Sequence, residues 1–240
     1  MTWILALCAV TIGAALQRVT GLGFTLVSGP LLVLVLNPFD GIVLANILSA
    51  LIALLVLVRT FRLVRWRAVL WLAIGILAGV PIGAVVVHTL DSDMLLVVVG
   101  ALTAVAVVLA LTRRPMRVFR GTGGAIFAGS VSGFSNVTAG VGGPALAMYG
   151  VATKMPMSAF VPTVQAVGFV TNVLSVAAKP QMSLPLPLVG AAVGCILLGL
   201  LVGTVLHRFV SPSRAQTLAL ALALAGALAA TARGVVALVG

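Results

Sequence analysis

A short glycine-containing stretch near the N-terminus has the residue types of an anion-binding site. Residues 17–24 read Gln-Arg-Val-Thr-Gly-Leu-Gly-Phe, and they interrupt an apolar region. Glycine tolerates positive φ and close backbone approach, so Gly21 and Gly23 can turn the chain and expose peptide N–H groups. A helix that begins after the turn would direct the positive end of its dipole back to the break, which favours anions. The side-chain donors next to the turn are Gln17, Arg18 and Thr20.

A second stretch of the same character lies in the other half of the chain, at residues 133–144. Its proline suits the first turn of a following helix, where the missing N–H costs nothing. Two helix N-termini, one from each stretch, would then face each other and favour a small oxyanion or dianion over a cation. The alternative is that both stretches are kinks that serve helix packing. The candidate residues here are Ser135, Asn136, Thr138, Gly140, Gly142, Gly143 and Pro144.

The charge of Arg18 allows two interpretations. The chain has only three acidic residues, all Asp, and none of them falls inside a predicted membrane span. A cation inside the membrane is costly and normally has a partner, so an anionic ligand or lipid would have to neutralise Arg18. Alternatively, the long side chain extends to the nearer membrane interface and contacts no ligand.

Polar amides and spaced glycines inside the apolar runs are further candidates. Asn46, Gln165 and Asn172 either hydrogen-bond a neighbouring helix or line the path of a ligand, and Asn46 and Gln165 are counted as binding residues. Glycines four residues apart indicate close helix packing, either within the chain or in a homodimer. The glycines with this spacing are Gly75, Gly79, Gly83, Gly199 and Gly203.

The elements that would position these residues are membrane-spanning helices. Hydrophobic residues make up 62% of the 240 residues and charged residues only 7%, too few to cover a water-facing surface. Six apolar runs approach the ~20 residues that a span needs. A glycine-broken region precedes each group of three, at 2–36 and 121–152, with pieces of only about 9–16 residues. We predict an all-α polytopic protein in which each broken region is a re-entrant hairpin or a pair of short helices. The six predicted spans are 41–58, 68–87, 94–111, 157–178, 184–206 and 215–239.

The loop charges predict the orientation of the protein in the membrane. Eleven positive charges and no acid fall on one side of the predicted alternation, in the loops 59–67 and 113–120 and at three later positions. Cytoplasmic loops collect Lys and Arg, so we predict that this side is cytoplasmic and that both termini are extracytoplasmic. The three later positions are Lys154, Arg208 and Arg214, and the opposite side carries Asp40, Asp91, Asp93 and Lys179.

The two halves are predicted to be inverted repeats. Residues 1–112 form the first repeat, 113–120 a basic cytoplasmic linker and 121–240 the second repeat, together one membrane domain. At an offset of 119 residues, Gln17 aligns with Asn136 and Asn46 with Gln165. An odd number of spans in each half inverts the second copy. Inverted repeats with broken helices are typical of secondary transporters, whose site lies at the repeat interface near the bilayer midplane.

Several function classes lack the residues they need. The basic residues lie between apolar runs, as expected for topology and contact with membrane lipid, and they do not indicate nucleic acid. We predict no metal and no cofactor, because no cluster of ligands and no carboxylate lies inside a span. The phosphate-binding loop of an ATPase is missing as well. Besides a transporter of a small anion, two alternatives stay open: a channel-like permease for anions or weak acids, and a membrane enzyme that acts on lipid head groups through Ser135.

Both glycine stretches resemble those of the TauE/SafE sulfite exporter family, part of the toluene-sulfonate uptake permease group. The resemblance rests on residues 17–24 followed by Ser-Gly-Pro-Leu at 28–31, and on residues 137–144, and it covers the whole chain. Phe24 stands where the commoner form of the first motif has a glycine. The resemblance implies a transporter of sulfite, a sulfonate or a related organosulfur anion in the bacterial inner membrane. We expect export, because an inside-negative potential favours anion exit without a coupling ion.

Overall fold

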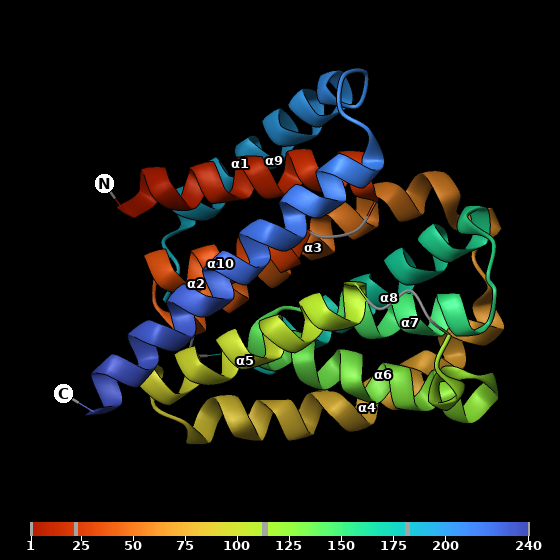
Figure 1. Ribbon diagram of the computed structural model, residues 1–240, viewed down its shortest axis with the longest axis horizontal. Coiled ribbons are helices and arrows are strands. Elements are labelled where there is room, and N and C mark those ends of the chain that lie inside the picture. The colour runs from red at the N-terminus through yellow and green to blue at the C-terminus, as the bar shows by residue number, and fades with distance from the viewer. Residues whose placement is uncertain (1, 22–23, 112–114, 181–182, 240) are drawn as a thin grey trace.

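The computed structural model, which describes residues 2–21, 24–111, 115–180 and 183–239, is a bundle of helices (Figure 1). In these ranges all regular structure is helical, and seven helices are long and apolar enough to cross a membrane. The predicted all-α polytopic fold class is therefore confirmed. The α-helices are α1 (Thr2–Thr20), α2 (Phe24–Val35), α3 (Pro38–Thr60), α4 (Trp66–Thr89), α5 (Ser92–Leu111), α6 (Gly121–Ala139), α7 (Gly143–Ala152), α8 (Met157–Ala177), α9 (Leu186–Leu206) and α10 (Pro212–Val239), with short 3₁₀ helices at Phe61–Leu63 and Arg117–Phe119.

The six predicted spans correspond to α3, α4, α5, α8, α9 and α10. Helix α3 begins at Pro38, slightly before residue 41, where the predicted span begins, and its N-cap explains this start. Asn37 is its N-cap, and the side-chain oxygen of Asn37 accepts a hydrogen bond from the Asp40 N–H at 2.8 Å. Asn is a favoured N-cap residue, and Pro38 fits the first turn because its missing N–H is not needed there.

The helices α1 and α6 are longer than the sequence pattern predicts. Each has 19 residues, about 28 Å of helix, so in each broken region only the second helix is short. Helical bonding continues through the polar residues: the Gly21 N–H donates to the Gln17 carbonyl at 2.8 Å, and the Gly140 N–H to the Asn136 carbonyl at 2.9 Å. Gly21 and Gly140 have φ values of +75° and +73°, the left-handed conformation in which glycine commonly ends a helix. Gly23 lies outside the described residues.

Glycines bring α4 close to α6, and α9 close to α1. In α4, Gly79 packs on the backbone of Ser130; in α9, a Cβ at Gly199 would lie 2.5 Å from the Thr11 carbonyl oxygen. The glycines of α4 pack on α6, and the glycines at the corresponding positions of α9 pack on α1, which corresponds to α6 in the first half. This exchange is what an inverted repeat requires, and the repeat itself stays a prediction. Of the two alternatives for the spaced glycines, packing within the chain accounts for these contacts. A homodimer also stays a prediction, and it would need another face, because the following glycines are all buried in the chain: Gly75, Gly79, Gly83, Gly199 and Gly203.

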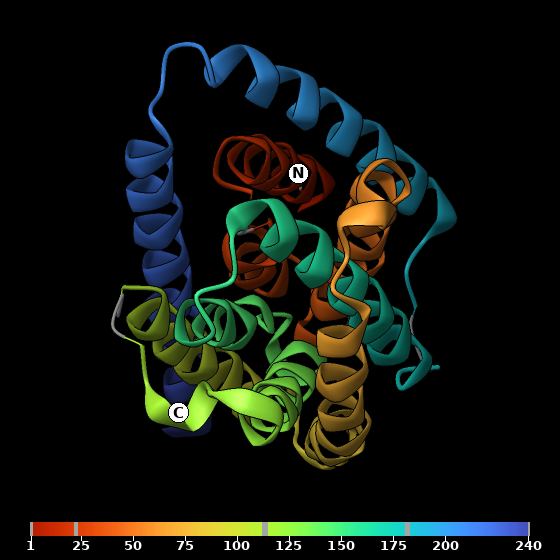
Figure 2. The ribbon, with the colours of Figure 1, turned by 90° about the vertical axis from the view of Figure 1, so that its right-hand side faces the viewer.

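Both chain termini lie at one end of the bundle (Figure 1). The loops that follow α3, α5, α7 and α9 lie at the other end, which faces the viewer in Figure 2. These are the loops in which the sequence places the excess of positive charge. The structure therefore groups the loops as the alternation of spans predicts, and the side of the membrane on which each group lies stays a prediction.

Two helices cross the middle of the molecule and carry polar residues there. Helix α3 packs along α8, and both contain buried amides: Asn46 in α3, Gln165 and Asn172 in α8. The glycine-ended helices α1 and α6, with the short helices that follow them, complete the surroundings of this polar centre.

Candidate anion-binding site

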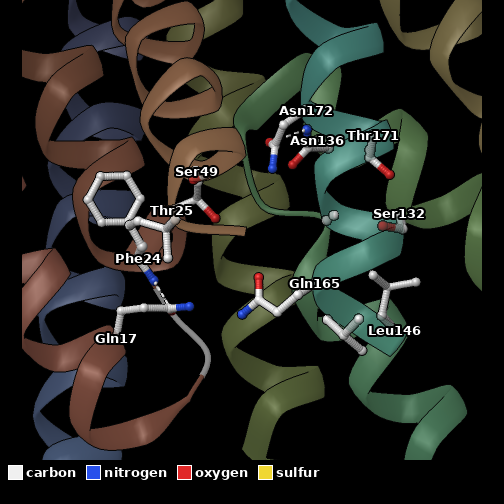
Figure 3. Close-up of a pocket in the computed structure, with 15 residues that line it drawn as sticks. Gln17, Phe24, Thr25, Ser49, Ser132, Asn136, Leu146, Gln165, Thr171 and Asn172 are labelled. Atoms are coloured by element: carbon white, nitrogen blue, oxygen red, sulfur yellow. Dashed lines mark hydrogen bonds between the residues drawn. The ribbon is translucent and has the colours of Figure 1, made fainter. Parts of the chain in front are cut away.

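A cavity of about 80 Å³ lies at the polar centre, between residues of α1, α2, α3, α6, α7 and α8 (Figure 3). Ser49 and Gly168, which line it, lie near the middle of α3 and α8. The cavity is therefore about halfway along α3 and α8. Among the described residues that line it, every side chain is neutral, so binding of an ion has to depend on dipoles and hydrogen bonds.

Two helix N-termini meet at this cavity. Phe24 and Thr25, which begin α2, line one wall, and Gly142 and Gly143, which begin α7, line another. The first N–H groups of a helix have no partner within that helix, and the dipole adds about half a positive charge at this end. The two glycine stretches are thus brought together as the sequence predicted, and the binding of an anion between them stays a prediction.

Asn136 holds the polar side chains around the cavity together. Its amide nitrogen lies 3.2 Å from Asn46 Oδ1, 3.0 Å from Asn172 Oδ1 and 3.0 Å from Ser175 Oγ. An amide nitrogen carries two hydrogens, so three acceptors share two donors. The network links α3, α6 and α8, which is the reason that the cavity has a defined shape at this side.

Two buried polar atoms beside this network have no hydrogen-bond partner within the described chain. They are Asn46 Nδ2 and Ser49 Oγ. Residues three apart lie on the same face of a helix, so both atoms belong to one face of α3. Leaving a buried polar group unpaired costs about 1–3 kcal/mol, which a ligand or water that accepts a hydrogen bond would recover. Ser49 lines the cavity, so its hydroxyl is an unused donor in the wall, and Asn46 lies behind the lining residues.

Gln17 and Gln165 approach the cavity from α1 and α8 (Figure 3). The Gln17 Oε1 atom accepts a hydrogen bond from the Phe24 N–H at 2.9 Å. This bond ties the last turn of α1 to the start of α2 and occupies one N–H there. Gln165 is buried, and its amide lies on the face of α8 that lines the cavity.

Arg18 does not line the cavity; its Nε donates to Thr204 Oγ1 of α9 at 3.1 Å, and its side chain is exposed. Thr204 lies two residues before α9 ends, at the end of the bundle that carries the basic loops. This placement favours the alternative in which Arg18 extends to the membrane interface. The predicted contact of Arg18 with the anion stays a prediction.

Several other candidate residues have structural partners away from the cavity. Thr20 Oγ1 donates to the Leu16 carbonyl at 2.8 Å and Thr138 Oγ1 to the Phe134 carbonyl at 2.6 Å, so both hydroxyls bond within their own helices. Ser135 and Pro144 line a different, largely apolar pocket between α4, α5, α6 and α7. The predicted residues that the structure brings together at the cavity are Gln17, Asn136, Gly142, Gly143 and Gln165, with Asn46 bonded behind them.

A comparison with protein families identifies the chain. Residues 5–230 match the family model described as sulfite exporter TauE/SafE. The chain belongs to this family. The resemblance predicted from the two glycine stretches is therefore confirmed, and TauE/SafE membership agrees with seven apolar helices in assigning a multi-pass membrane transporter. Neither the curated proteins nor the solved structures contain a match to the chain.

The structure of this TauE/SafE member also shows cavity residues that the sequence analysis missed. Ser49 lies one helical turn after Asn46, and Ser132 one turn before Asn136. Residues three or four apart share a helix face, so this spacing from the predicted amides was a usable indication. Lys179 lies in the loop after α8, between the predicted spans, and no sequence pattern indicated that its side chain is fully buried.

Proposed function

We propose that this protein exports a small sulfur oxyanion or organosulfonate across the bacterial inner membrane. The anion would bind in the central cavity, between the N-termini of α2 and α7. The observation that carries this proposal is the meeting of two helix N-termini at a cavity with neutral walls and unused donors. The membership in a sulfite exporter family supplies the sulfur chemistry of the substrate.

The chemistry of the walls favours an anion over a cation. Both helix dipoles present their positive ends, and the unpaired Ser49 Oγ in the wall can donate a hydrogen bond, with the unpaired Asn46 Nδ2 behind it. Backbone N–H groups at a helix N-terminus bind the oxygens of sulfate-like and phosphate-like groups without further side chains. A cation would meet the same positive ends, and no described lining residue is a carboxylate that could balance it.

The direction and coupling follow from the membrane potential. An inside-negative potential favours the exit of an anion by about 2.3 kcal/mol per charge per 100 mV. Export would therefore need no coupling ion, which agrees with the described lining residues, none of which is a carboxylate that could bind H⁺ or Na⁺. Alternate opening of the cavity to each side would come from movement of the two inverted repeats relative to each other.

Flux from proteoliposomes tests the proposal. Vesicles that contain the purified protein are loaded with sulfite or sulfoacetate, and efflux is measured with and without an imposed inside-negative potential. We expect saturable efflux that increases with the potential and is missing from vesicles without protein. Efflux that is unchanged when the potential is collapsed would contradict electrogenic export.

The same experiment separates the remaining possibilities. Efflux that rises in proportion to concentration and never saturates would favour the channel-like permease over a carrier. If neither anion moves, the sulfur assignment is wrong for this chain, and other small anions should be tested in its place.

A further inference from the structure

Lys179 is a buried cation without a counter-charge in the described part of the chain. It lies two residues after the end of α8, and its side chain is 0% exposed. Its Nζ atom approaches the Ser175 carbonyl oxygen at 3.4 Å, a long and weak hydrogen bond. Buried charges are normally paired, because removing an ammonium group from water is costly. An ammonium group in this position needs a partner that arrives from elsewhere.

The side chain of Lys179 extends back toward the cavity. Its hydrogen bond is to Ser175, one helical turn earlier, and the hydroxyl of Ser175 lies 3.0 Å from the Asn136 amide nitrogen. Asn136 and Asn172, which the same network joins, line the cavity. Ser175 therefore lies between the Lys179 ammonium group and Asn136 in the cavity wall. The ammonium group is on the side of the cavity that faces the chain termini.

The titratable groups around Lys179 are engaged elsewhere. Of the helices that pack on α8, α3 brings Asp40 to this end, and both Asp40 oxygens accept hydrogen bonds from Ser183, at 3.1 and 2.9 Å. Helix α4 brings His88, whose Nε2 lies 2.8 Å from the Ala178 carbonyl oxygen. The described parts of α6, α7 and α9 bring no titratable group to this end. Burial lowers the pKa of Lys179 from 10.5 to about 7, and no neighbouring charge contributes.

We propose that Lys179 is a second anion contact, on the outer side of the central cavity, and that it supplies the positive charge which the cavity walls lack. This inference rests on the proposed anion transport. Above pH 7 the buried amine is mostly neutral while no anion is near. When the anion lies beside it, the amine becomes an ammonium ion, with a proton taken from water on the outer side. When the anion leaves to the outside, the proton returns to the water on the outer side, so the amine is restored and no proton crosses the membrane with the anion.

Proton uptake on anion binding provides the test. The detergent-purified full chain is titrated with sulfoacetate by calorimetry at pH 8, in two buffers that differ in ionisation enthalpy. Sulfoacetate is chosen because both of its acid groups stay ionised there. Between pH 7 and 9 the free amine is increasingly neutral, so bound anion should draw a proton from the buffer. We expect uptake by the wild-type chain, loss of uptake in Lys179→Met, and binding weakened by about tenfold or more, as for a lost hydrogen bond to a charged group.

The matched control is Lys154→Met, which removes an exposed lysine from the opposite end of the bundle. It should leave both affinity and proton uptake unchanged. Binding by the wild-type chain without proton uptake, or uptake that persists in Lys179→Met, overturns the role of Lys179 and leaves the proposed function intact. If the wild-type chain binds no sulfoacetate and no sulfite, the proposed function fails, and this inference fails with it.

Thermal stability separates this role from a structural one. A lysine that holds the fold together would lower the melting temperature when it is replaced. A buried and unpaired ammonium destabilises the folded chain, so Lys179→Met should raise the melting temperature while it weakens anion binding. Below pH 7 the folded wild-type chain must bury the charged form of Lys179, so the increase in melting temperature of Lys179→Met should be largest there. It should shrink as the pH rises toward 10.5, because the neutral amine is buried without that cost.

Discussion

Asn136 and Gln165 reach the same cavity but differ in what they hold in place. Asn136 joins side chains from α3 and α8, whereas Gln165 presents an amide to the cavity from the middle of α8. A single substitution at each position can therefore separate the binding of an anion from the stability of the bundle.

Replacing Gln165 by Leu keeps the volume of the side chain and removes its amide. We expect sulfite or sulfoacetate flux to fall about tenfold, the effect of one lost hydrogen bond to a charged group, with the melting temperature nearly unchanged. Asn136→Leu should lower both flux and melting temperature, because it leaves three buried acceptors unpaired. Flux in proteoliposomes and thermal unfolding in detergent check the pair. Wild-type flux in Gln165→Leu would place the anion elsewhere.

Arg18 provides the complementary prediction, because it is charged but lies away from the cavity. Its bond to Thr204 is exposed, and exposed contacts of this kind contribute little. We expect Arg18→Ala to keep flux within about twofold of the wild-type chain, as expected for the loss of an exposed contact. Thr204→Val, which removes the same hydrogen bond from the other side, should behave alike. Complete loss of flux in Arg18→Ala, with normal expression, would instead support the predicted contact with the anion.

At the scale of the elements, the glycine-lined contacts between α4 and α6, and between α9 and α1, set how closely the helices pack. Gly79 has the Ser130 backbone directly over its Cα, whereas a Cβ added at Gly190 of α9 would meet nothing within 4 Å. Both glycines lie inside spanning helices, so they form a matched pair in which only the neighbouring helix differs.

Gly79→Ala should therefore destabilise the protein and Gly190→Ala should not. A methyl group at Gly79 has to separate α4 from α6, and overpacking of this kind costs about 1–3 kcal/mol. At Gly190 the same change adds a good helix former in open space. The fraction of monodisperse protein that survives heating in detergent measures the difference. Equal tolerance of both changes would show that the contact between α4 and α6 is looser than the structure has it.

The elements were predictable from the sequence to the extent that hydropathy and length define them. The six spans emerge because a bilayer requires about 20 apolar residues in a helix. The lengths of α1 and α6 could not be predicted in this way. Their last turns contain the polar residues Gln17 and Asn136, which resemble a break in the sequence, but the helices continue up to Gly21 and Gly140. In the site, the amides and the helix N-termini could be found from their spacing. The burial of Lys179 and the distance of Arg18 from the cavity depend on which helices pack together, and no local pattern encodes that.

At the scale of the whole molecule, the basic loops and the termini lie at opposite ends of the bundle. The excess of Lys and Arg predicts that the basic end lies in the cytoplasm. Alkaline phosphatase fused to the C-terminus should then be active, and the same enzyme fused after Arg120 should be inactive. Green fluorescent protein at the two positions should give the reverse pattern. An inactive C-terminal phosphatase with an active fusion after Arg120 would invert the proposed orientation.

The position of the cavity halfway along α3 and α8 has an electrical consequence. An anion that reaches it from the cytoplasm crosses about half of the membrane field. Occupancy from the inside should therefore depend on voltage by about 1 kcal/mol per charge per 100 mV, half of the full transmembrane value. The apparent affinity for cytoplasmic anion would rise about sevenfold over that range, so a de-energised cell would lose saturation of the carrier as well as driving force.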